Sequence, residues 1–283
     1  MKTTITLLTG LFLLASCTAV KIAVPEQFSS QATPMKVEGL NGWKFNEQLS
    51  FGTYVTSSVK RGWDISNGSR FSRFSLKAED IILSGFNIHS DREKYNERNR
   101  FQYSIQDASL VTEVLAQERF SENQIVYKSN MDWLNNLKRT DKYEYAFSAT
   151  IIPLNFNKGE VWSLTMLNEF DAKKTKQNIG ERPQTKDLGY VTNGKEKIEI
   201  KPLFLTKRIT ASGKEGKVLG GPIHTGYELR WDDGVVGLVD IMDNKVWIVN
   251  ELDRKEKMIL SAVASAILLK RKQDVYTERT DSI

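Results

Sequence analysis

The sequence predicts a mainly β fold: a β-rich α+β domain in which an antiparallel meander forms a curved sheet or barrel with a buried C-terminal helix. The first observation is a series of turn signals between runs of β-branched and aromatic residues. The second is the alternation of residues 227–231, which places apolar and charged side chains on opposite faces. The third is one long apolar segment, residues 258–269. With 283 residues, 40% of them hydrophobic, the chain can bury a sizeable core.

The chain opens on a short segment that is typical of an export signal. Lys2 supplies a positive charge, and an apolar run of about ten residues extends to Leu14. A membrane-spanning helix needs roughly 20 such residues, so the run is too short to cross a bilayer. Small residues follow at Ala15 and Ser16, and then comes Cys17, the single cysteine of the chain.

The tetrapeptide Leu14-Ala15-Ser16-Cys17 resembles the lipobox of bacterial lipoproteins. The resemblance implies that residues 1–16 are a signal peptide and that Cys17 is the lipid attachment site, with three acyl chains such as palmitate. It also implies a membrane partner, because several acyl chains anchor a protein stably where one does not. The alternative is an ordinary secretory signal that contains a cysteine by chance.

The residues after Cys17 bear on localisation in the cell envelope. In the lipoproteins that the motif resembles, an aspartate after the cysteine retains the protein at the inner membrane, and this chain has Thr18 there. Early acidic residues direct some lipoproteins to the cell surface, but here Lys21 precedes the first acid, Glu26. The resemblance therefore implies a lipid anchor in the outer membrane that faces the periplasm.

Domain organisation follows from composition. Residues 17–40 are predicted to be a lipidated N-terminus and flexible tether, because Ser29 to Pro34 contains turn formers and no apolar period. Residues 41–270 form the β-rich globular domain, and residues 271–283 are a polar tail. The polar segment 171–187 is a surface loop within one sheet or a linker between two lobes. The single sheet is favoured because the flanking strands have the same character.

Five turn signals, mostly Asn-Gly or Asp-Gly pairs, separate the predicted strands. Such pairs suit tight hairpins, which require the positive φ that Gly and Asn tolerate. The signals are Asn67-Gly68, Asn157-Lys158-Gly159, Asn193-Gly194, Asp233-Gly234 and Asp243-Asn244. The predicted strands are Tyr54–Ile65, Arg70–Leu76, Ala146–Phe156, Val161–Leu167, Leu188–Thr192, Lys195–Ile200, Tyr227–Trp231, Val235–Ile241 and Val246–Val249.

Three segments are predicted to be helical. Asp107–Arg119 has apolar pairs at helical spacing and a possible cap at its start, and Ser129–Lys138 is predicted as a short helix. Leu252–Lys270 is the strongest prediction, because residues 258–269 are apolar or small all round. A surface helix would have a polar face, and twelve residues span only about 18 Å. This helix is therefore expected inside the protein.

A strand meander that ends in a buried apolar helix is similar to the architecture of tubby proteins and phospholipid scramblases, over roughly residues 190–270. That resemblance implies a closed barrel around the helix. The alternative is a helix that lies on one face, or across one end, of a curved sheet, as in lipid-binding half-barrels.

The search for catalytic and metal-binding residues yields no recognisable set. No Gly-x-Ser-x-Gly elbow or HExxH motif occurs, and His89 is merely adjacent to a serine and an aspartate. His224, in a glycine-flanked predicted loop, is the one candidate binding residue. The acids Asp232, Asp233, Asp240 and Asp243 lie at predicted hairpin turns, where aspartate is expected for backbone reasons. We expect no catalytic residues, no metal and no cofactor.

The charge pattern bears on partners. The net charge of +5 is mild, and basic and acidic residues are interleaved, so no nucleic-acid partner is expected. The sequence favours a lipid-anchored, non-catalytic binding or structural module for an apolar ligand, a lipid or a partner protein. An apolar cavity larger than a few hundred Å³ would distinguish a ligand carrier from a partner-binding module. An envelope glycan hydrolase is the alternative, with a cleft that holds two carboxylates.

Overall fold

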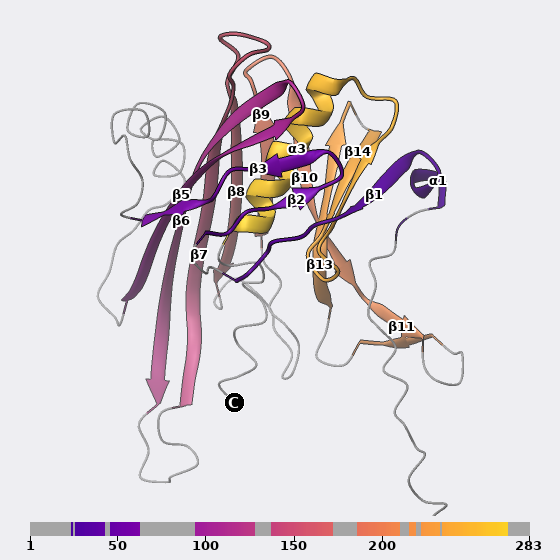
Figure 1. The fold of residues 1–283 in the computed structure, drawn as a ribbon. Helices are drawn as coiled ribbons and strands as arrows, with labels where there is room; N and C mark the ends of the chain where they lie inside the picture. Colours follow the sequence, from indigo (N-terminus) through magenta and orange to yellow (C-terminus); the bar gives the residue numbers. More distant parts are fainter. Residues whose placement is uncertain are drawn as a thin grey trace, which may run out of the picture.

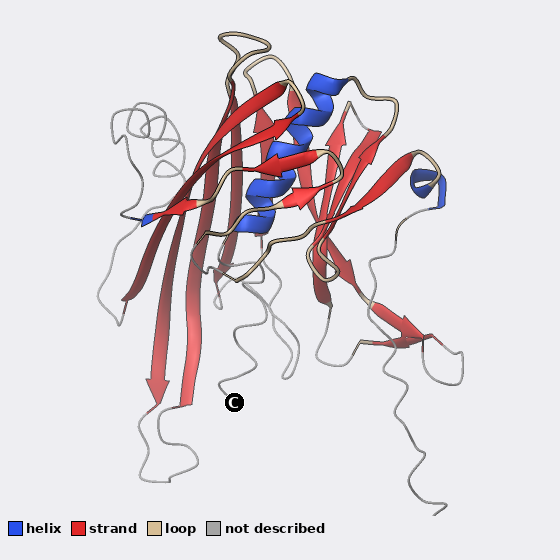
Figure 2. Ribbon diagram, viewed as in Figure 1, coloured by secondary structure: helices blue, strands red, loops and turns tan. Residues whose placement is uncertain are grey.

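The computed structural model describes residues 24, 26–42, 46–62, 94–127, 137–171, 186–209, 215–218, 222–232 and 234–270. In this part the protein is mainly β, as the sequence predicts (Figures 1 and 2). The strands are β1 (Ala32–Lys36), β2 (Ser50–Phe51), β3 (Tyr54–Thr56), β4 (Lys60–Arg61), β5 (Lys94–Asp107), β6 (Leu110–Tyr127), β7 (Leu137–Pro153), β8 (Trp162–Asp171), β9 (Lys186–Thr192), β10 (Lys197–Leu205), β11 (Lys207–Ile209), β12 (Glu215–Lys217), β13 (Ile223–Trp231), β14 (Gly234–Asp240) and β15 (Lys245–Val249). The described helices are α1 (Glu26–Ser29) and α3 (Arg254–Leu269).

Nearly all strands belong to one antiparallel sheet that is almost closed into a barrel. The sheet has 13 strands in the order β1-β15-β14-β13-β10-β9-β8-β7-β6-β5-β3-β2, with β4 paired to β5. Its two ends meet where Glu38 and Ser50 exchange backbone hydrogen bonds of 2.9 and 3.2 Å. The short strands β11 and β12 form a separate two-stranded sheet that projects from the barrel (Figure 1).

Four of the five predicted turn signals are confirmed as connections between neighbouring strands. Asn157 and Gly159 have positive φ between β7 and β8, and Gly194 has φ 90° between β9 and β10. Asp232 and Asn244 have positive φ in the turns that precede and follow β14. Positive φ is the conformation that these tight turns require. The fifth signal, Asn67-Gly68, lies outside the described residues.

The predicted helix at Asp107–Arg119 is wrong. Asp107 ends β5, Ala108 has φ 47° in a tight turn, and Leu110 begins β6. The apolar pairs that mimic helical spacing occur because β6 is covered on both faces: Val114 is buried on the inner face and Leu115 on the outer face. The segment Ser129–Lys138 lies outside the described residues except for its last two, which begin β7 and are therefore not helical.

The predicted tether is also corrected over its C-terminal part. Residues 32–36 form β1, which pairs with β15, and Phe28 in α1 is buried. This segment lacks an apolar period because β1 lies at the end of the sheet, where few of its side chains are covered. Pro34 fits this position, since an edge strand tolerates a residue with no backbone N–H. Residues 17–23 lie outside the described part.

The sheet continues across the polar segment 171–187. β8 and β9 pair in one register from Ser163 opposite Thr192 to Glu169 opposite Lys186. Residues 172–185, which connect the two strands, lie outside the described part. β8 and β9 are therefore neighbours in one sheet.

The C-terminal helix is confirmed, and α3 lies within the curve of the sheet (Figure 2). It contacts β5, β6 and β7 on one side and β14 and β15 on the other. All twelve residues from Met258 to Leu269 are buried. The helix is thin enough to allow close contact, and Ser265 Oγ lies 2.7 Å from the Tyr103 hydroxyl of β5. A buried helix inside a nearly closed barrel is the arrangement that the tubby and scramblase resemblance implies, although kinship with those families stays a prediction.

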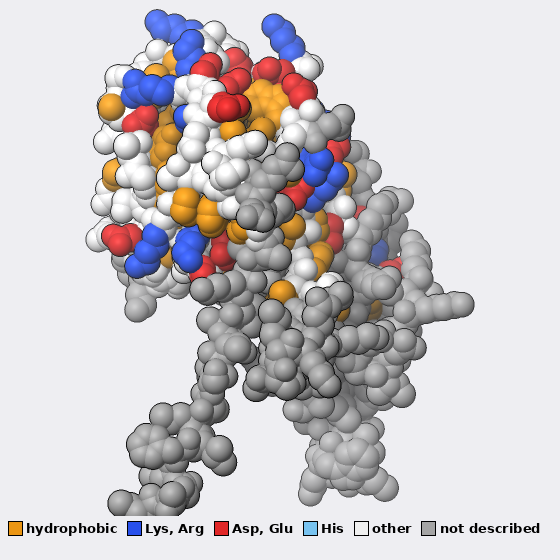
Figure 3. Space-filling view, turned by 90° about the vertical axis from the view of Figure 1, so that its right-hand side faces the viewer, with side chains coloured by type: hydrophobic (Ala, Val, Ile, Leu, Met, Phe, Trp, Pro, Cys, Tyr) orange, Lys and Arg blue, Asp and Glu red, His pale blue; other side chains and the backbone are white. Residues whose placement is uncertain are grey.

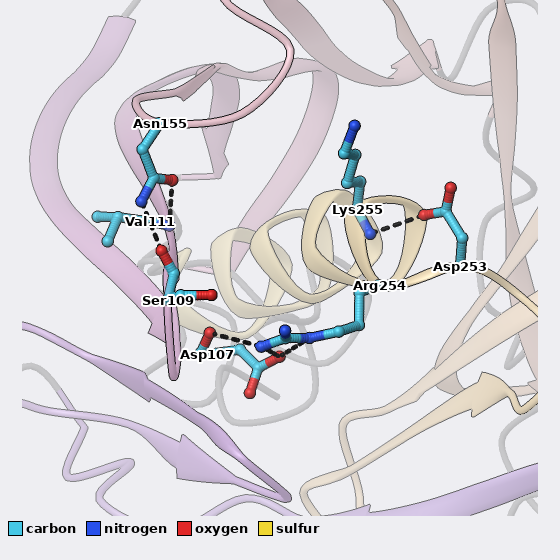
Figure 4. Close-up of polar contacts among 7 residues, drawn as sticks. All are labelled: Asp107, Ser109, Val111, Asn155, Asp253, Arg254 and Lys255. Atoms are coloured by element: carbon cyan, nitrogen blue, oxygen red, sulfur yellow. Dashed lines mark hydrogen bonds and ion pairs between the residues drawn. The ribbon is translucent and has the colours of Figure 1, made fainter.

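Polar contacts fix the N-terminus of α3 (Figure 4). The Asp253 carboxylate accepts the backbone N–H groups of Lys255 and Glu256, and the Glu256 side chain accepts that of Asp253, which completes a capping box. Arg254 donates to the carboxylate and the carbonyl of Asp107 over 3.2–3.3 Å. The helix is thereby joined to the β5–β6 turn.

The same turn is held from its other side by Asn155 of the β7–β8 connection (Figure 4). The Asn155 side chain accepts the Val111 N–H at 3.0 Å and donates to the Ser109 carbonyl at 2.5 Å. Side-chain bonds of this kind take the place of a regular ladder at the ends of strands. The β5–β6 turn therefore contacts both the N-terminus of α3 and the β7–β8 connection.

Neither described helix has the length and apolar content needed to span a bilayer.

Replacing Ser265 by arginine should unfold the domain, because it would bury a charge and displace the helix from β5. We expect Ser265→Ala to lower the free energy of unfolding by about 1 kcal/mol through the lost hydrogen bond. Ser265→Arg should lower it by more than about 4 kcal/mol. Denaturant unfolding followed by circular dichroism measures both. The control Lys255→Ala, at an exposed position of the same helix, should leave stability nearly unchanged, and an unaltered unfolding midpoint in Ser265→Arg would contradict the buried position of α3.

Candidate functional site

A group of polar and aromatic side chains lies inside the barrel at the C-terminal end of α3. We call Glu118, Tyr145, His224, Tyr227 and Lys270 the Lys270 cluster. These residues come from β6, β7, β13 and the end of the helix, so the fold assembles them from distant parts of the chain. The cavity beside the cluster is lined by Tyr145, Met166, Leu167, Asn168, Asp187, Leu188, Gly189, Ile200, Pro202, His224, Tyr227 and Lys270.

Lys270 is the central residue of the cluster. It is the C-cap of α3, and its extended backbone, with φ −64° and ψ 143°, ends the helix. The side chain is only 2% exposed, and Nζ donates a hydrogen bond of 2.5 Å to the Tyr227 hydroxyl. The Nζ atom also lies 4.7 Å from the ring centre of Tyr227 and 5.6 Å from that of Tyr145. Aromatic rings stabilise a desolvated ammonium through their negative faces.

Glu118 supplies the negative charge of the cluster. It is buried on β6 and accepts a hydrogen bond of 2.9 Å from the Tyr145 hydroxyl. Burial, followed by the negative charge of Glu118, raises the pKa of the Tyr145 phenol well above its usual range. Tyr145 therefore remains a neutral donor at physiological pH. A lysine and a glutamate thus share one buried site with two tyrosines, which agrees with the rule that buried charges are compensated.

His224 belongs to this cluster, but it does not lie in the loop that the sequence predicts. It is on β13 with 2% exposure, and its ring lies 4.7 Å from Tyr227 and 5.4 Å from Phe204 between ring centres. The pairing of β10 and β13 shifts register between Leu203 and Phe204, opposite this histidine. Such bulges redirect side chains and occur often beside functional sites.

Gly226 permits the close strand packing next to His224. A Cβ atom at this position would lie 2.0 Å from the Val239 carbonyl oxygen of β14. Gly226 thus lies within β13, where the close approach of a neighbouring backbone requires a glycine.

An ion pair between Arg61 and Glu47 lies near the same end of α3. Arg61 donates to the Glu47 carboxylate at 2.5 Å and to the Leu269 carbonyl at 3.2 Å. Its guanidinium carbon lies 5.0 Å from the ring centre of Phe101. A cation beside the last carbonyls of a helix interacts favourably with the helix dipole. Arg61 and Lys270 therefore both stabilise the C-terminus of α3, one from β4 and one from the helix itself.

The cavity beside the cluster is small, and its mouth carries exposed apolar side chains. It has about 30 Å³ of free space, enough for two or three water molecules, which need roughly 10–15 Å³ each. Leu188 on β9 lines it and is 49% exposed, and Phe204, in contact with His224, is 37% exposed. Asn168 donates a hydrogen bond to Asp187 at the same opening. The arrangement can accept a small polar group between two apolar contacts.

The remaining residues considered in the sequence analysis include Cys17, His89 and Asp240. Cys17 and His89 lie outside the described residues, so lipidation of Cys17 stays a prediction. Asp240 is buried and its carboxylate accepts the N–H groups of Met242 and Asp243 at 2.9 and 3.0 Å, so it shapes the turn after β14. Burial raises the pKa of Asp240. Among the described residues, no group of three or more His, Cys, Asp or Glu side chains is arranged to hold a metal ion.

Sequence reasoning missed four members of the cluster. Tyr227 lay on the apolar face of a predicted strand, Tyr145 lay next to one, and Glu118 lay in a segment that was predicted to be helical. Lys270 carries the one usable signal: it is the first charged residue after twelve apolar or small residues of a buried helix. A cation in that position must either reach solvent or find compensation inside the protein.

No protein family, no curated protein and no solved structure matches this chain. The site is therefore interpreted from its own geometry.

Lys270→Met should destabilise the protein, because the change keeps the apolar stem and removes the charge and the donor to Tyr227. We expect the free energy of unfolding to fall by about 2 kcal/mol, the usual size for a charge-assisted buried hydrogen bond. Thermal or denaturant unfolding measures this. Lys255→Met, at an exposed lysine of the same helix, serves as the control and should change stability by less than about 0.5 kcal/mol. Equal midpoints for the two variants would show that the lysine contributes nothing to the fold.

Proposed function

We propose that this protein is a lipid-anchored cell-envelope protein whose helix-filled barrel is a non-catalytic module that binds a partner protein. The anchor rests on the lipobox resemblance at Cys17, which also favours the outer membrane and its periplasmic face. The binding role is inferred from the barrel interior, which α3 fills.

The observation that carries the proposal is the position of α3. In a barrel that carries a small ligand, the interior must be empty enough to admit it, and ligand pockets commonly measure about 300–1,000 Å³. Here Met258 to Leu269 occupy the interior and are buried on every side. The cavity beside the Lys270 cluster has about 30 Å³ of free space. This cavity is too small for a lipid or another large apolar ligand, which favours a partner protein that binds at the surface.

The mouth of the Lys270 cluster is the best candidate contact for such a partner. The exposed Leu188 lines the cavity, and the exposed Phe204 packs against His224, which also lines it. Protein interfaces commonly combine a few apolar anchors with hydrogen-bonding groups that become desolvated on binding. Leu188 pairs with Leu167 of β8, and Phe204 pairs with His224 of β13, so the backbone beneath both residues is already held in the sheet before binding occurs.

Cys17→Ser should abolish acylation and leave residues 1–16 attached, because a serine cannot form the thioether that lipid transfer requires. Metabolic labelling with an alkyne analogue of palmitate, followed by mass measurement of the purified protein, tests this. Thr18→Ser keeps the thiol and should label normally. A Cys17→Ser protein that still carries the label would refute the anchor.

Leu188→Glu combined with Phe204→Glu should separate the protein from its partner without unfolding it, because both side chains are already exposed. We expect native electrophoresis of extracts from the native host's membranes to show a complex for the wild type and free protein for this variant. The matched control is Leu154→Glu with Met242→Glu, which changes two other exposed apolar residues, 42% and 45% exposed. Native mass spectrometry of the wild type provides the opposing outcome: one tightly held lipid per chain would establish a ligand carrier instead.

A further inference from the structure

We propose that Lys270 binds small aldehydes covalently, through a reversible imine that forms in the cavity beside its side chain. The proposal concerns the interior of the barrel and requires neither the lipid anchor nor the partner contact described above. A lysine amine that is desolvated in a pocket is the group with which proteins form imines with carbonyl compounds. The position of the amine, the charges around it, its proton contacts and the size of the cavity each support this chemistry.

The amine of Lys270 lies at the wall of the cavity. Lys270 is 2% exposed and lines the cavity, and so does Tyr227, whose hydroxyl accepts the hydrogen bond from Nζ. The rest of the wall is mostly apolar, with Met166, Ile200 and Pro202 among its residues. A lysine in water is almost entirely protonated at pH 7 and is therefore a weak nucleophile. The amine of Lys270, by contrast, is withdrawn from bulk water.

The charges of the site favour a neutral ligand over an anion. Glu118 already shares the buried site with the Lys270 ammonium, and Asp187 lines the cavity. A bound anion would add a further negative charge, which is costly in a desolvated site. An aldehyde is neutral, and its protonated imine keeps the positive charge of the lysine. Imine formation therefore leaves the balance between Lys270 and Glu118 unchanged.

The Lys270 cluster also contains groups that can carry the protons of the reaction. Glu118 is its carboxylate, and transfer of a proton from the ammonium to Glu118 turns two buried charges into a neutral acid and a neutral amine. The Tyr227 hydroxyl lies 2.5 Å from Nζ, close enough to exchange a proton with the reacting nitrogen. Tyr145 donates a hydrogen bond to Glu118 and thereby orients the carboxylate.

The steps balance in atoms and charge. The neutral Lys270 nitrogen attacks the carbonyl carbon, a C–N bond forms, and the carbonyl electron pair moves to the oxygen. Tyr227 gives its proton to that oxygen and takes one from the nitrogen, which leaves a neutral carbinolamine. The Glu118 acid then protonates the carbinolamine hydroxyl, the C–O bond breaks, and water leaves as the nitrogen electron pair forms the C=N bond. An ammonium and an aldehyde have become a protonated imine and water, and Glu118 is a carboxylate again.

The size of the cavity restricts the aldehyde. Its free space of about 30 Å³ is that of two or three water molecules at roughly 10–15 Å³ each. Formaldehyde and acetaldehyde, with about as many heavy atoms, fit this space, whereas an aromatic aldehyde does not. The expected ligands are therefore aldehydes of one or two carbon atoms.

Exposed lysines of the same chain provide an internal reference. Figure 3 shows Lys and Arg side chains distributed over the described part of one face, among acidic and hydrophobic ones. Lys255 is exposed at the opposite end of α3 from Lys270. Because no cavity encloses such an amine, it does not discriminate between aldehydes by size.

Borohydride trapping on the purified full chain at about pH 7 tests the proposal. The protein is incubated with acetaldehyde or, in parallel, with benzaldehyde; borohydride then reduces any imine to a stable secondary amine, and peptide mass mapping gives the yield at each lysine. We expect acetaldehyde to modify Lys270 about ten-fold faster than Lys255 or more, and benzaldehyde to modify Lys255 but not Lys270. Equal or slower modification of Lys270 by acetaldehyde, or its modification by benzaldehyde, would overturn the proposal.

Tyr227→Phe tests the assigned proton transfer, because it removes the hydroxyl and keeps the ring. We expect the rate at Lys270 to fall about ten-fold or more, with the rate at Lys255 unchanged. Circular dichroism shows whether the variant is folded, and an unchanged rate at Lys270 in the folded variant would contradict the mechanism. The size selectivity of the wild type needs no substitution, so it decides the proposal even where the variant is unstable.

Discussion

The burial of α3 is the constraint on which the rest of the structure depends. Twelve successive residues without a charged side chain cannot leave any face of the helix in water, so the sheet must surround it. The antiparallel meander does so by curving until Glu38 meets Ser50. The small residues of the helix, such as Ser261 and Ser265, let the strands approach its axis. The same helix occupies the space in which other barrels hold their ligands.

An α-helix leaves backbone N–H groups at its N-terminus and carbonyl groups at its C-terminus without partners inside the helix. In α3 the two ends find their hydrogen-bond partners in different ways. At the N-terminus the capping box of Asp253 and Glu256 satisfies backbone N–H groups, and the Arg254 side chain binds Asp107 in partly exposed surroundings. At the C-terminus the groups lie inside the barrel. There Arg61 reaches the Leu269 carbonyl, and Lys270 turns its amine towards two tyrosines. The most polar part of the interior therefore exists because the helix ends there.

Much of the fold could be predicted from the sequence, because its main signals are local. The all-apolar helix, the hairpin turns and the alternation in β13 each depend on residues close together in the chain. The errors arose where tertiary contacts decide. β6 looked helical since both of its faces are covered, and β1 looked like a tether since an edge strand needs few apolar residues. The candidate site was mostly hidden for the same reason. His224 could be singled out as unusual, but its neighbours Tyr145, Glu118 and Lys270 are distant in sequence and meet only after the sheet closes.

The order of elements along the chain has a consequence for how the protein is made. The helix that fills the core is the last described element, and Ser265 bonds to Tyr103, 162 residues earlier. The strands made first therefore have no stable centre until nearly the whole polypeptide has emerged, and such long-range pairing forms slowly. If the chain is exported as we propose, delayed collapse would be an advantage, because a translocation channel admits an unfolded polypeptide.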